Sequence, residues 1–497
     1  MIIKAAPKPK VTIEGILGRG YFPPELPPPF STRSFASLIA ATKTASLPQE
    51  FTQKKNQWCD FVAYSLSRPG SLRRRLALLN PVAYYRLAKF VVDHQAELIK
   101  RATASHLSLA KPAAGIARQL KRSKRFDAVP LERAMVRMGE RFLLTADVSR
   151  FYPSIYTHAI DWAISSKARA KRQLKSKGKK PTVGATLDKL VQSCQSGQTR
   201  GIPIGPAVSM LLSELLLTKV DARLKARKIT HGFRYADDYE LTFNERAQAE
   251  RALAALEDAL AEFELELNPA KTNINELPQE LDNRGIQELR RFEFRTQYQA
   301  QRSDLMHFFT RAFALHKEFP DKAILRYAVS RLSPATTTGA NAELLQRLIL
   351  QAVSYESGVW PMAIDQLVEL HRTHPLLSVA DVGLTIHSMI RNYAHLNHSS
   401  EVAWSLWAGL VFAIRLTAAA VKSVVSMLDD CCCLLLFDAA SRGLTAINLR
   451  QRRLRHGFHR TVYAGRTGYW RTSLLFRVGS LRQNRRTISL KMPSSSF

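Results

Sequence analysis

Two adjacent carboxylates, Asp237 and Asp238, lie between short segments of strand-forming residues. Apolar and aromatic side chains alternate with polar ones in residues 233–235 and 239–241, which predicts a β-hairpin with both acids at its tip. Carboxylate oxygens suit Mg²⁺, an ion that keeps several waters and binds one or two protein carboxylates together with substrate phosphates. An Asp-Asp dipeptide by itself is more often a polar turn, so a metal site requires another carboxylate from elsewhere in the chain.

Asp147 is the candidate for that carboxylate, because it follows the largely apolar residues 143–146 and is expected at the end of a strand. Together with Asp237 and Asp238 it fits two-metal phosphoryl transfer. In that chemistry one ion activates an attacking 3′-hydroxyl group, and the other holds a triphosphate and its leaving group. We therefore predict that Asp147 and Asp237 bridge two Mg²⁺ ions, with Mn²⁺ as an alternative metal.

The segments around these acids resemble those of reverse transcriptases. Residues 235–238 (Tyr-Ala-Asp-Asp) resemble the catalytic hairpin of that family, and residues 147–152 resemble its first metal-binding strand. Other family motifs are matched in the family's order: the basic segment opening the fingers (75–81), the Gly/Pro loop lining the template and nascent base pair (201–209), and the segment whose lysine reaches the triphosphate (267–272). This ordered set is a specific signal.

The resemblance implies roles for individual residues. The Val148 carbonyl completes the metal coordination, and Asp238 assists as a partial ligand. Tyr152 occupies the position of the family's steric gate, an aromatic ring that fills the space a ribose 2′-hydroxyl would need, so the product is expected to be DNA. For Tyr152 and Phe151 the alternative is packing in the core. The other residues expected to bind dNTPs are Phe151, Gly205 and Lys271.

Within the family, the chain most resembles the bacterial antiphage enzymes, the abortive-infection and defence-associated group. Segments 19–30, 151–158 and 201–206 carry this resemblance. It implies an RNA-directed DNA polymerase of an antiviral defence system that copies an RNA template, for which a dedicated noncoding RNA is one candidate. Ile204 stands where most members have a Gln that contacts the incoming nucleotide. Untemplated or protein-primed synthesis, and a non-catalytic RNA-binding or maturase-like scaffold, therefore stay open as alternatives.

The charge of the chain also indicates a nucleic-acid partner. Lys and Arg number 73 against 41 Asp and Glu, a formal charge of +32, which is typical of a protein that binds phosphates. Residues 166–187 are basic and contain no acid, which predicts an exposed loop or helix on backbone phosphates, with an idle insertion as the alternative. The residues expected to bind nucleic acid are Arg75, Lys171, Arg172 and Lys175.

Length and composition predict two or three domains in an α+β fold. The resemblance implies a right-hand polymerase palm and fingers, the reverse transcriptase fold, followed by an all-helical C-terminal domain. The expected limits are a Pro-rich extension (1–50), fingers and palm (51–300), a helical thumb or repeat-like domain (301–440) and a basic Arg-rich tail (441–497). The tail either binds single-stranded RNA or has no evolved role.

Nothing in the sequence predicts a membrane partner. Arg415 and Lys422 interrupt the most apolar stretch, residues 402–427, so a buried helix is expected there. The N-terminus lacks an apolar signal region and the cysteines lack metal or disulfide spacing, which predicts a cytoplasmic protein. A second defence subunit and a second copy of the chain are candidate protein partners.

Overall fold

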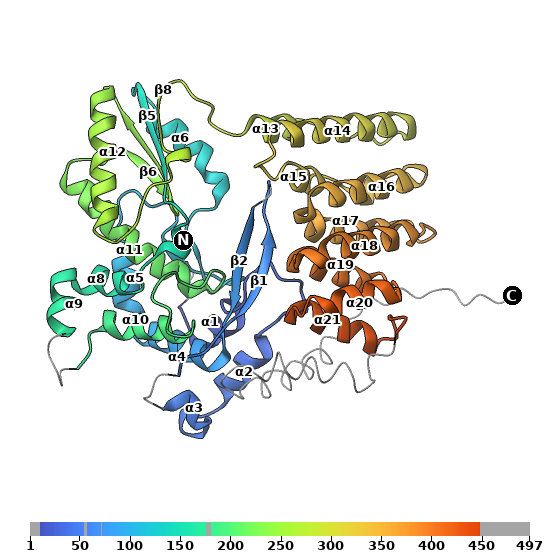
Figure 1. Ribbon diagram of the computed structural model, residues 1–497. Helices are drawn as coiled ribbons and strands as arrows, with labels where there is room; N and C mark the ends of the chain where they lie inside the picture. Colours follow the sequence, from blue (N-terminus) through green and yellow to red (C-terminus); the bar gives the residue numbers. More distant parts are fainter. Residues whose placement is uncertain (1–9, 54–56, 71, 175–179, 448–497) are drawn as a thin grey trace, which may run out of the picture. The chain divides into compact units, whose positions relative to one another are not determined.

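The computed structural model describes residues 10–53, 57–70, 72–174 and 180–447, and its contacts divide the chain into two units (Figure 1). Among the described residues, the first unit comprises 10–24, 31–62 and 76–281, and the second comprises 25–30, 63–75 and 282–447. Residues 63–75 thus belong to the second unit, although they lie within the range expected for fingers and palm.

A four-stranded antiparallel sheet is the centre of the first unit. Its strands are β5 (Phe142–Asp147), β6 (Gly232–Tyr235), β7 (Asp238–Phe243) and β8 (Asn273–Glu276), in the order β6-β7-β5-β8. The strand predicted before Asp147 is confirmed as β5. The predicted hairpin is confirmed as β6 and β7, which pair in antiparallel register.

The two faces of this sheet are covered differently. Leu144 and Leu241 belong to the main hydrophobic core together with residues of α11 (Ala207–Ala226) and α12 (Arg246–Ala261). Successive side chains of a strand point to opposite faces, so Asp147 and Asp238 lie on the face away from these helices. The helical spacing of Leu253, Leu256, Leu260 and Phe263 predicts an amphipathic helix over residues 245–263, and α12 confirms it.

Helices and hairpins surround the sheet in the first unit. Residues 23–29 are non-helical, as expected for the Pro-rich segment, but helices form on both sides of it. In chain order the remaining elements of this unit are α1 (Ile13–Arg19), α2 (Arg33–Ala41), α3 (Gln49–Thr52), α4 (Pro81–Asp93), α5 (Gln95–Ala102), β3 (Pro112–Ala114), β4 (Leu120–Arg122), α6 (Val129–Val136), α7 (Phe151–Ser154), α8 (His158–Ser165), α9 (Lys167–Leu174) and α10 (Val183–Ser193). The hairpin of β1 (Val62–Ser67) and β2 (Arg73–Leu78) belongs mostly to the second unit.

The second unit confirms the prediction of a helical C-terminal part. From α14 onward, each helix packs against the next but one, and most consecutive helices also pack against each other, which produces a two-layered stack like that of helical repeat proteins (Figure 1). Its helices are α13 (Arg284–Arg290), α14 (Tyr298–Glu318), α15 (Ile324–Ser330), α16 (Gly339–Tyr355), α17 (Trp360–Thr373), α18 (Ala380–Tyr393), α19 (Ser399–Val411), α20 (Ala418–Ser426) and α21 (Asp430–Ser441).

The hairpin of β1 and β2 is tied to the start of α19 within the second unit. The main-chain N–H of Ser65 donates to Ser399 Oγ at 3.0 Å, and that of Ser67 donates to Ser400 Oγ at 2.8 Å. Arg73 Nη2 donates to Glu401 Oε2 at 2.8 Å, and the Glu401 side chain is only 2% exposed. These bonds explain why residues 63–75 belong to this unit.

The apolar stretch 402–427 forms two helices rather than one. α19 ends at Val411, Ala413 adopts the left-handed conformation with φ of 53°, and α20 begins at Ala418. Much of α19 is buried inside the helical stack. Within the described part of the chain, no helix combines the length and apolar character needed to cross a membrane.

Candidate active site

The turn between β6 and β7 presents the predicted acidic pair. Tyr235 and Asp238 are opposite each other in the register, so Ala236 and Asp237 form the turn itself. Ala236 has φ of 56°, in the left-handed region that costs a non-glycine residue about 1–2 kcal/mol. A strained residue directly before Asp237 shows that surrounding contacts hold this turn in one conformation.

Asp147 joins the acidic pair from the neighbouring strand. It is the last residue of β5 and lies opposite Asp238 in the β5–β7 register, and the two side chains are hydrogen-bonded. Asp147 is 9% exposed. The three carboxylates expected from the sequence therefore come together at one end of the sheet.

A loop from the other side of β5 completes the surroundings of Asp147. Asn268 donates from its main-chain N–H to the Asp147 carbonyl at 2.8 Å and from Nδ2 to Asp147 Oδ2 at 3.1 Å. Its Oδ1 also accepts from the Ala270 N–H, at the start of the short 3₁₀ turn that carries Lys271. Lys271 Nζ lies 3.4 Å from Asp147 Oδ1. Sequence reasoning singled out Lys271 but missed Asn268, whose position three residues earlier was the available signal.

The negative charges at this site are crowded. Asp238 is exposed at the start of β7, but partial desolvation of its carboxylate, followed by the neighbouring Asp237 and Asp147 carboxylates, raises its pKa to about 7, while Lys271 acts in the opposite direction. Hard oxygen donors with excess negative charge have the chemistry that a divalent cation requires. Among the described residues, no group of three or more His, Cys, Asp or Glu side chains has the geometry of a complete metal site.

Replacing Asp238 with Asn is expected to stabilise the metal-free protein at alkaline pH. The pKa of Asp238 is about 7 in the folded protein and about 3.9 in an unfolded chain. The folded state therefore binds the extra proton between these values, and stability falls as the pH rises from about 4 to 7. After allowance for solvent screening, Asp238→Asn should be more stable by about 1 kcal/mol at pH 8 and by less at pH 5.

Urea unfolding without divalent ions, with the exposed Asp258→Asn as the control, measures this difference. Added Mg²⁺ should reduce the advantage of Asp238→Asn. A variant less stable than the wild-type protein at pH 8 contradicts the assigned charge crowding.

Two aromatic residues follow Asp147 on α7, and they are placed differently. Phe151 is 4% exposed and lies in the main core. Tyr152 is only partly buried, and its hydroxyl group lies 3.3 Å from Ser213 Oγ on α11. Burial is the largest cause that raises the pKa of Tyr152, so its hydroxyl stays neutral at physiological pH. Val148, between Asp147 and these residues, is buried, and its main chain pairs with Leu267.

Comparison with protein families identifies the type of domain that contains these carboxylates. Residues 72–296 match the family model described as reverse transcriptase (RNA-dependent DNA polymerase). This segment is a reverse transcriptase domain. The protein is therefore an RNA-directed DNA polymerase, a nucleotidyltransferase, and reverse transcriptases generally use divalent metal ions.

Curated proteins give no match. Among solved structures, apo telomerase from Candida tropicalis is similar, with 12% sequence identity and a TM-score of 0.34, and the match covers 71% of this chain and 69% of that chain.

The Gly/Pro loop of the reverse transcriptase domain requires glycine at position 205. Gly205 has φ of 123°, and a Cβ atom there would lie 2.4 Å from Cγ of Pro23. Arg118 Nη2 donates to the Gly205 carbonyl at 2.5 Å. Close packing against Pro23 thus explains the glycine, and its role in binding dNTPs remains a prediction.

Arg122, at the end of β4, is a site residue that sequence reasoning missed. Its guanidinium carbon lies 5.3 Å from the centre of the Tyr235 ring. Burial acts to lower the pKa of Arg122, but Tyr152, Tyr235 and Asp237 together raise it. Arg122 therefore brings positive charge close to Tyr152 and to the β6–β7 turn. No motif marked it, because its neighbours come from distant segments.

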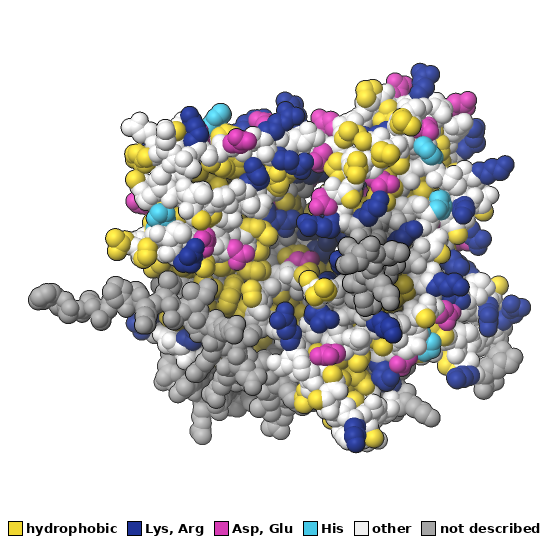
Figure 2. Space-filling model, turned by 180° about the vertical axis from the view of Figure 1, so that it is seen from behind, with side chains coloured by type: hydrophobic (Ala, Val, Ile, Leu, Met, Phe, Trp, Pro, Cys, Tyr) yellow, Lys and Arg dark blue, Asp and Glu magenta, His cyan; other side chains and the backbone are white. Residues whose placement is uncertain are grey.

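The residues predicted to bind nucleic acid belong to different units of the chain. Lys171 and Arg172 are exposed on α9, whereas Arg75 is exposed on β2 in the second unit. Lys175 lies outside the described residues. Figure 2 shows Lys and Arg side chains spread over one face of the molecule, in keeping with the strongly basic composition.

Proposed function

We propose that this RNA-directed DNA polymerase acts in a bacterial antiviral defence system, extending DNA on an RNA template by two-metal phosphoryl transfer. The observation that carries the catalytic part is the meeting of Asp147 with Asp237 and Asp238 at the end of the sheet, beside Lys271. We assign the sheet with α11 and α12 to the palm of a right-hand polymerase and the segments before β5 to its fingers.

The residues of the site have separate tasks in this proposal. When bound, two Mg²⁺ ions would activate the 3′-hydroxyl group and balance the charge of the triphosphate. Asp147 and Asp237 would hold both ions, and Asp238 and the Val148 carbonyl would complete their coordination. Lys271, now beside Asp147, would neutralise or protonate the departing pyrophosphate. Arg122 would add positive charge for the triphosphate.

Tyr152 is proposed to exclude ribonucleotides with its ring. Replacing Tyr152 with Ala should reduce the preference for dNTPs over NTPs by about 10²-fold, because the space for a 2′-hydroxyl group opens. Tyr152→Phe is the matched control, since it keeps the ring and loses only the contact with Ser213 Oγ. Single-nucleotide incorporation with each sugar measures the preference. Equal preferences in Tyr152→Ala and the wild-type protein contradict the steric role.

Basic residues outside the site are proposed to hold the nucleic acid. The residues that would contact backbone phosphates are Lys171 and Arg172 on α9, Arg75 on β2, and Lys175. Because these contacts are electrostatic, the affinity for nucleic acid should fall steeply as the salt concentration rises. The proposed ligands of the protein are the incoming nucleotide, the RNA template and the DNA product. A cytoplasmic location fits these partners and remains a prediction.

The defence role rests on the resemblance of segments 19–30, 151–158 and 201–206 to antiphage enzymes, and the helical stack of the second unit is compatible with it. A phage plaque assay on bacteria that express the protein tests it. The wild-type protein should lower plaque numbers and Asp237→Ala should not. Equal protection by the two proteins would show that defence does not require DNA synthesis at this site. If neither protein lowers plaque numbers, the proposed defence role is wrong.

Untemplated or protein-primed synthesis is the second candidate, and Ile204 is the observation that favours it. Ile204 lies in the ordered Gly/Pro loop, where its carbonyl accepts from the Ala77 N–H at 2.9 Å, and it lacks the amide of the Gln usual in the family. DNA that remains attached to protein after denaturation, or that has no complementary template, would favour this candidate. RNA binding without synthesis would favour the scaffold.

A further inference from the structure

A fully buried arginine lies directly behind the catalytic turn. Arg234 is 0% exposed and stands opposite Tyr239 in the β6–β7 register, one residue before the pair that closes the turn. Both side chains point to the sheet face covered by α11. A buried guanidinium group is costly unless acceptors surround it, so its partners are informative.

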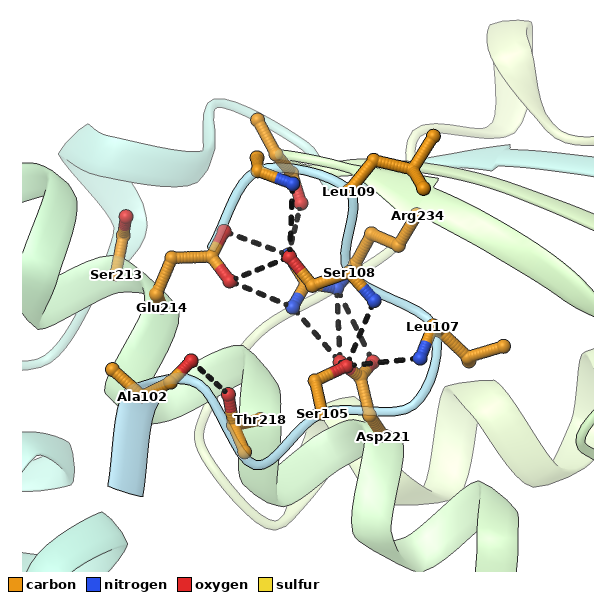
Figure 3. Close-up of polar contacts among 12 residues, drawn as sticks. Ala102, Ser105, Leu107, Ser108, Leu109, Ser213, Glu214, Thr218, Asp221 and Arg234 are labelled. Atoms are coloured by element: carbon orange, nitrogen blue, oxygen red, sulfur yellow. Dashed lines mark hydrogen bonds and ion pairs between the residues drawn. The ribbon is translucent and has the colours of Figure 1, made fainter. Parts of the chain in front are cut away.

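Two carboxylates of α11 enclose the Arg234 guanidinium group (Figure 3). Nη1 and Nη2 each donate to Glu214 at 3.0 Å, and Nη2 also donates to Asp221 Oδ2 at 2.8 Å. Glu214 and Asp221 are seven residues apart on the helix and therefore share a face. The Tyr239 hydroxyl group donates to Asp221 Oδ1 at 2.9 Å. Burial acts to lower the pKa of Arg234, but Asp221 and Glu214 raise it well above its usual value.

The same guanidinium group reaches the turn. Nη1 donates to the Ala236 carbonyl oxygen at 2.6 Å. The peptide bond is planar, so holding this oxygen fixes the orientation of the peptide that joins Ala236 to Asp237. It also explains how Ala236 keeps its left-handed conformation, with φ of 56°. Arg234 thereby links the rigid helix α11 to the residue that precedes the metal-binding carboxylate.

The loop before β3 secures Arg234 from a third direction. The Arg234 N–H donates to the Leu107 carbonyl at 2.9 Å, and the Leu109 N–H donates to the Arg234 carbonyl at 2.8 Å. Ser105 Oγ donates to Asp221 Oδ2 at 2.6 Å, and Ser108 Oγ donates to Glu214 Oε2 at 2.9 Å. Helix, loop and hairpin thus share one buried polar cluster, and Arg234 is the member that contacts the turn.

We propose that Arg234 is a positioning residue for DNA synthesis: held by Glu214 and Asp221, it fixes the Ala236 carbonyl and so orients Asp237 for metal binding. The proposal rests on the proposed catalytic role of Asp237. Residues that orient metal ligands typically change metal affinity or activity by about 10–100-fold when replaced.

Arg234→Lys is the principal test, because lysine keeps the charge but lacks the planar fork of donors that reaches both carboxylates and the turn. Its rate of nucleotide addition should fall about 10–100-fold, and its half-saturating Mg²⁺ concentration should rise by a similar factor. Without substrates, Mn²⁺ binding followed by electron paramagnetic resonance should weaken as well. Binding to a primed RNA template should be unchanged.

Ser108→Ala is the matched control, because it loses a hydrogen bond of the cluster but no contact with the turn. It should reduce stability and keep the wild-type dependence on Mg²⁺. Glu214→Gln weakens the contact between α11 and Arg234, so it should raise the half-saturating Mg²⁺ concentration as Arg234→Lys does. This variant keeps the proposal testable if Arg234→Lys does not fold.

The outcomes separate this proposal from the one on which it rests. If Asp237→Ala is inactive while Arg234→Lys and Glu214→Gln keep the wild-type dependence on Mg²⁺, Arg234 has only a structural role. If Ser108→Ala raises the half-saturating Mg²⁺ concentration as much as Arg234→Lys does, the positioning role is also overturned. General weakening of the buried polar cluster would then be enough to explain the effect. If Asp237→Ala remains active, the site assignment itself fails.

Discussion

Replacing Asp147 with Asn is expected to lower the rate of nucleotide addition by at least about 10³-fold. Asp147 is proposed to bridge the two metal ions, and the loss of such a carboxylate removes several kcal/mol of charge stabilisation from the transition state. The change keeps the size of the side chain. It also keeps a carbonyl oxygen to accept from Asn268 Nδ2, now at 3.1 Å from Asp147 Oδ2. The fold should therefore persist. Primer extension with saturating dNTPs and Mg²⁺ measures the rate, and thermal unfolding reports the fold.

Asp258→Asn is the control for this substitution, because Asp258 lies on the exposed side of α12 and pairs with Arg227. It should extend a primer at the wild-type rate. Extension by Asp147→Asn at a rate within tenfold of the wild-type protein would show that the carboxylate at the end of β5 is not a metal ligand.

Replacing Glu401 with Ala should destabilise the second unit by about 3–5 kcal/mol, the cost typical of removing one partner from a buried ion pair. Glu401 is 2% exposed on its side chain, and it accepts from Arg73 Nη2 and from Ser400 Oγ. Its loss would leave the Arg73 guanidinium group without its carboxylate. Urea unfolding and hydrogen exchange of residues 63–75 and 399–411 measure the effect.

Glu369→Ala provides the comparison, since Glu369 pairs with Arg372 at the surface of the same unit. Exposed ion pairs contribute little to stability because water screens them, so this variant should unfold almost as the wild-type protein does. Arg73→Met combined with Glu401→Ala should cost less than the sum of the single changes, because the two residues interact. Similar costs for Glu401→Ala and Glu369→Ala would contradict the importance of the buried pair.

Features carried by short sequence segments were predictable. The alternation around Asp237 and Asp238 identified the β6–β7 hairpin, and the apolar run before Asp147 identified β5. Helical spacing in residues 245–263 identified α12. In each case the signal is a local periodicity. Side chains three or four residues apart share one face of a helix, and side chains two residues apart share one face of a strand. The helical character of the C-terminal part was predictable for the same reason.

Features that depend on distant segments were not predictable. Ser65 and Ser399 meet although 334 positions separate them, and neither residue has a pattern that identifies its partner. Arg122 reaches the site from β4, and Arg234 meets Glu214 and Asp221 on another element. A charged residue inside a strand is usually taken as exposed, so the complete burial of Arg234 follows only from the carboxylates that the fold brings to it.

Local composition was misleading where geometry decides the outcome. Phe151 and Tyr152 are adjacent aromatic residues, but the short helix α7 turns the first into the core and leaves the second partly accessible. The apolar stretch 402–427 contains no helix-breaking proline or strongly polar run, so a single helix was expected. The left-handed residue Ala413 nevertheless ends α19, and the chain resumes as α20.

Sequencing the product made on a defined, primed RNA template tests the central claim most directly. Purified wild-type protein with Mg²⁺ and the four dNTPs should produce DNA complementary to that RNA, and Asp237→Ala under the same conditions should produce none. DNA unrelated to the template, or equal synthesis by the two proteins, would contradict templated polymerisation at the Asp147–Asp237–Asp238 site.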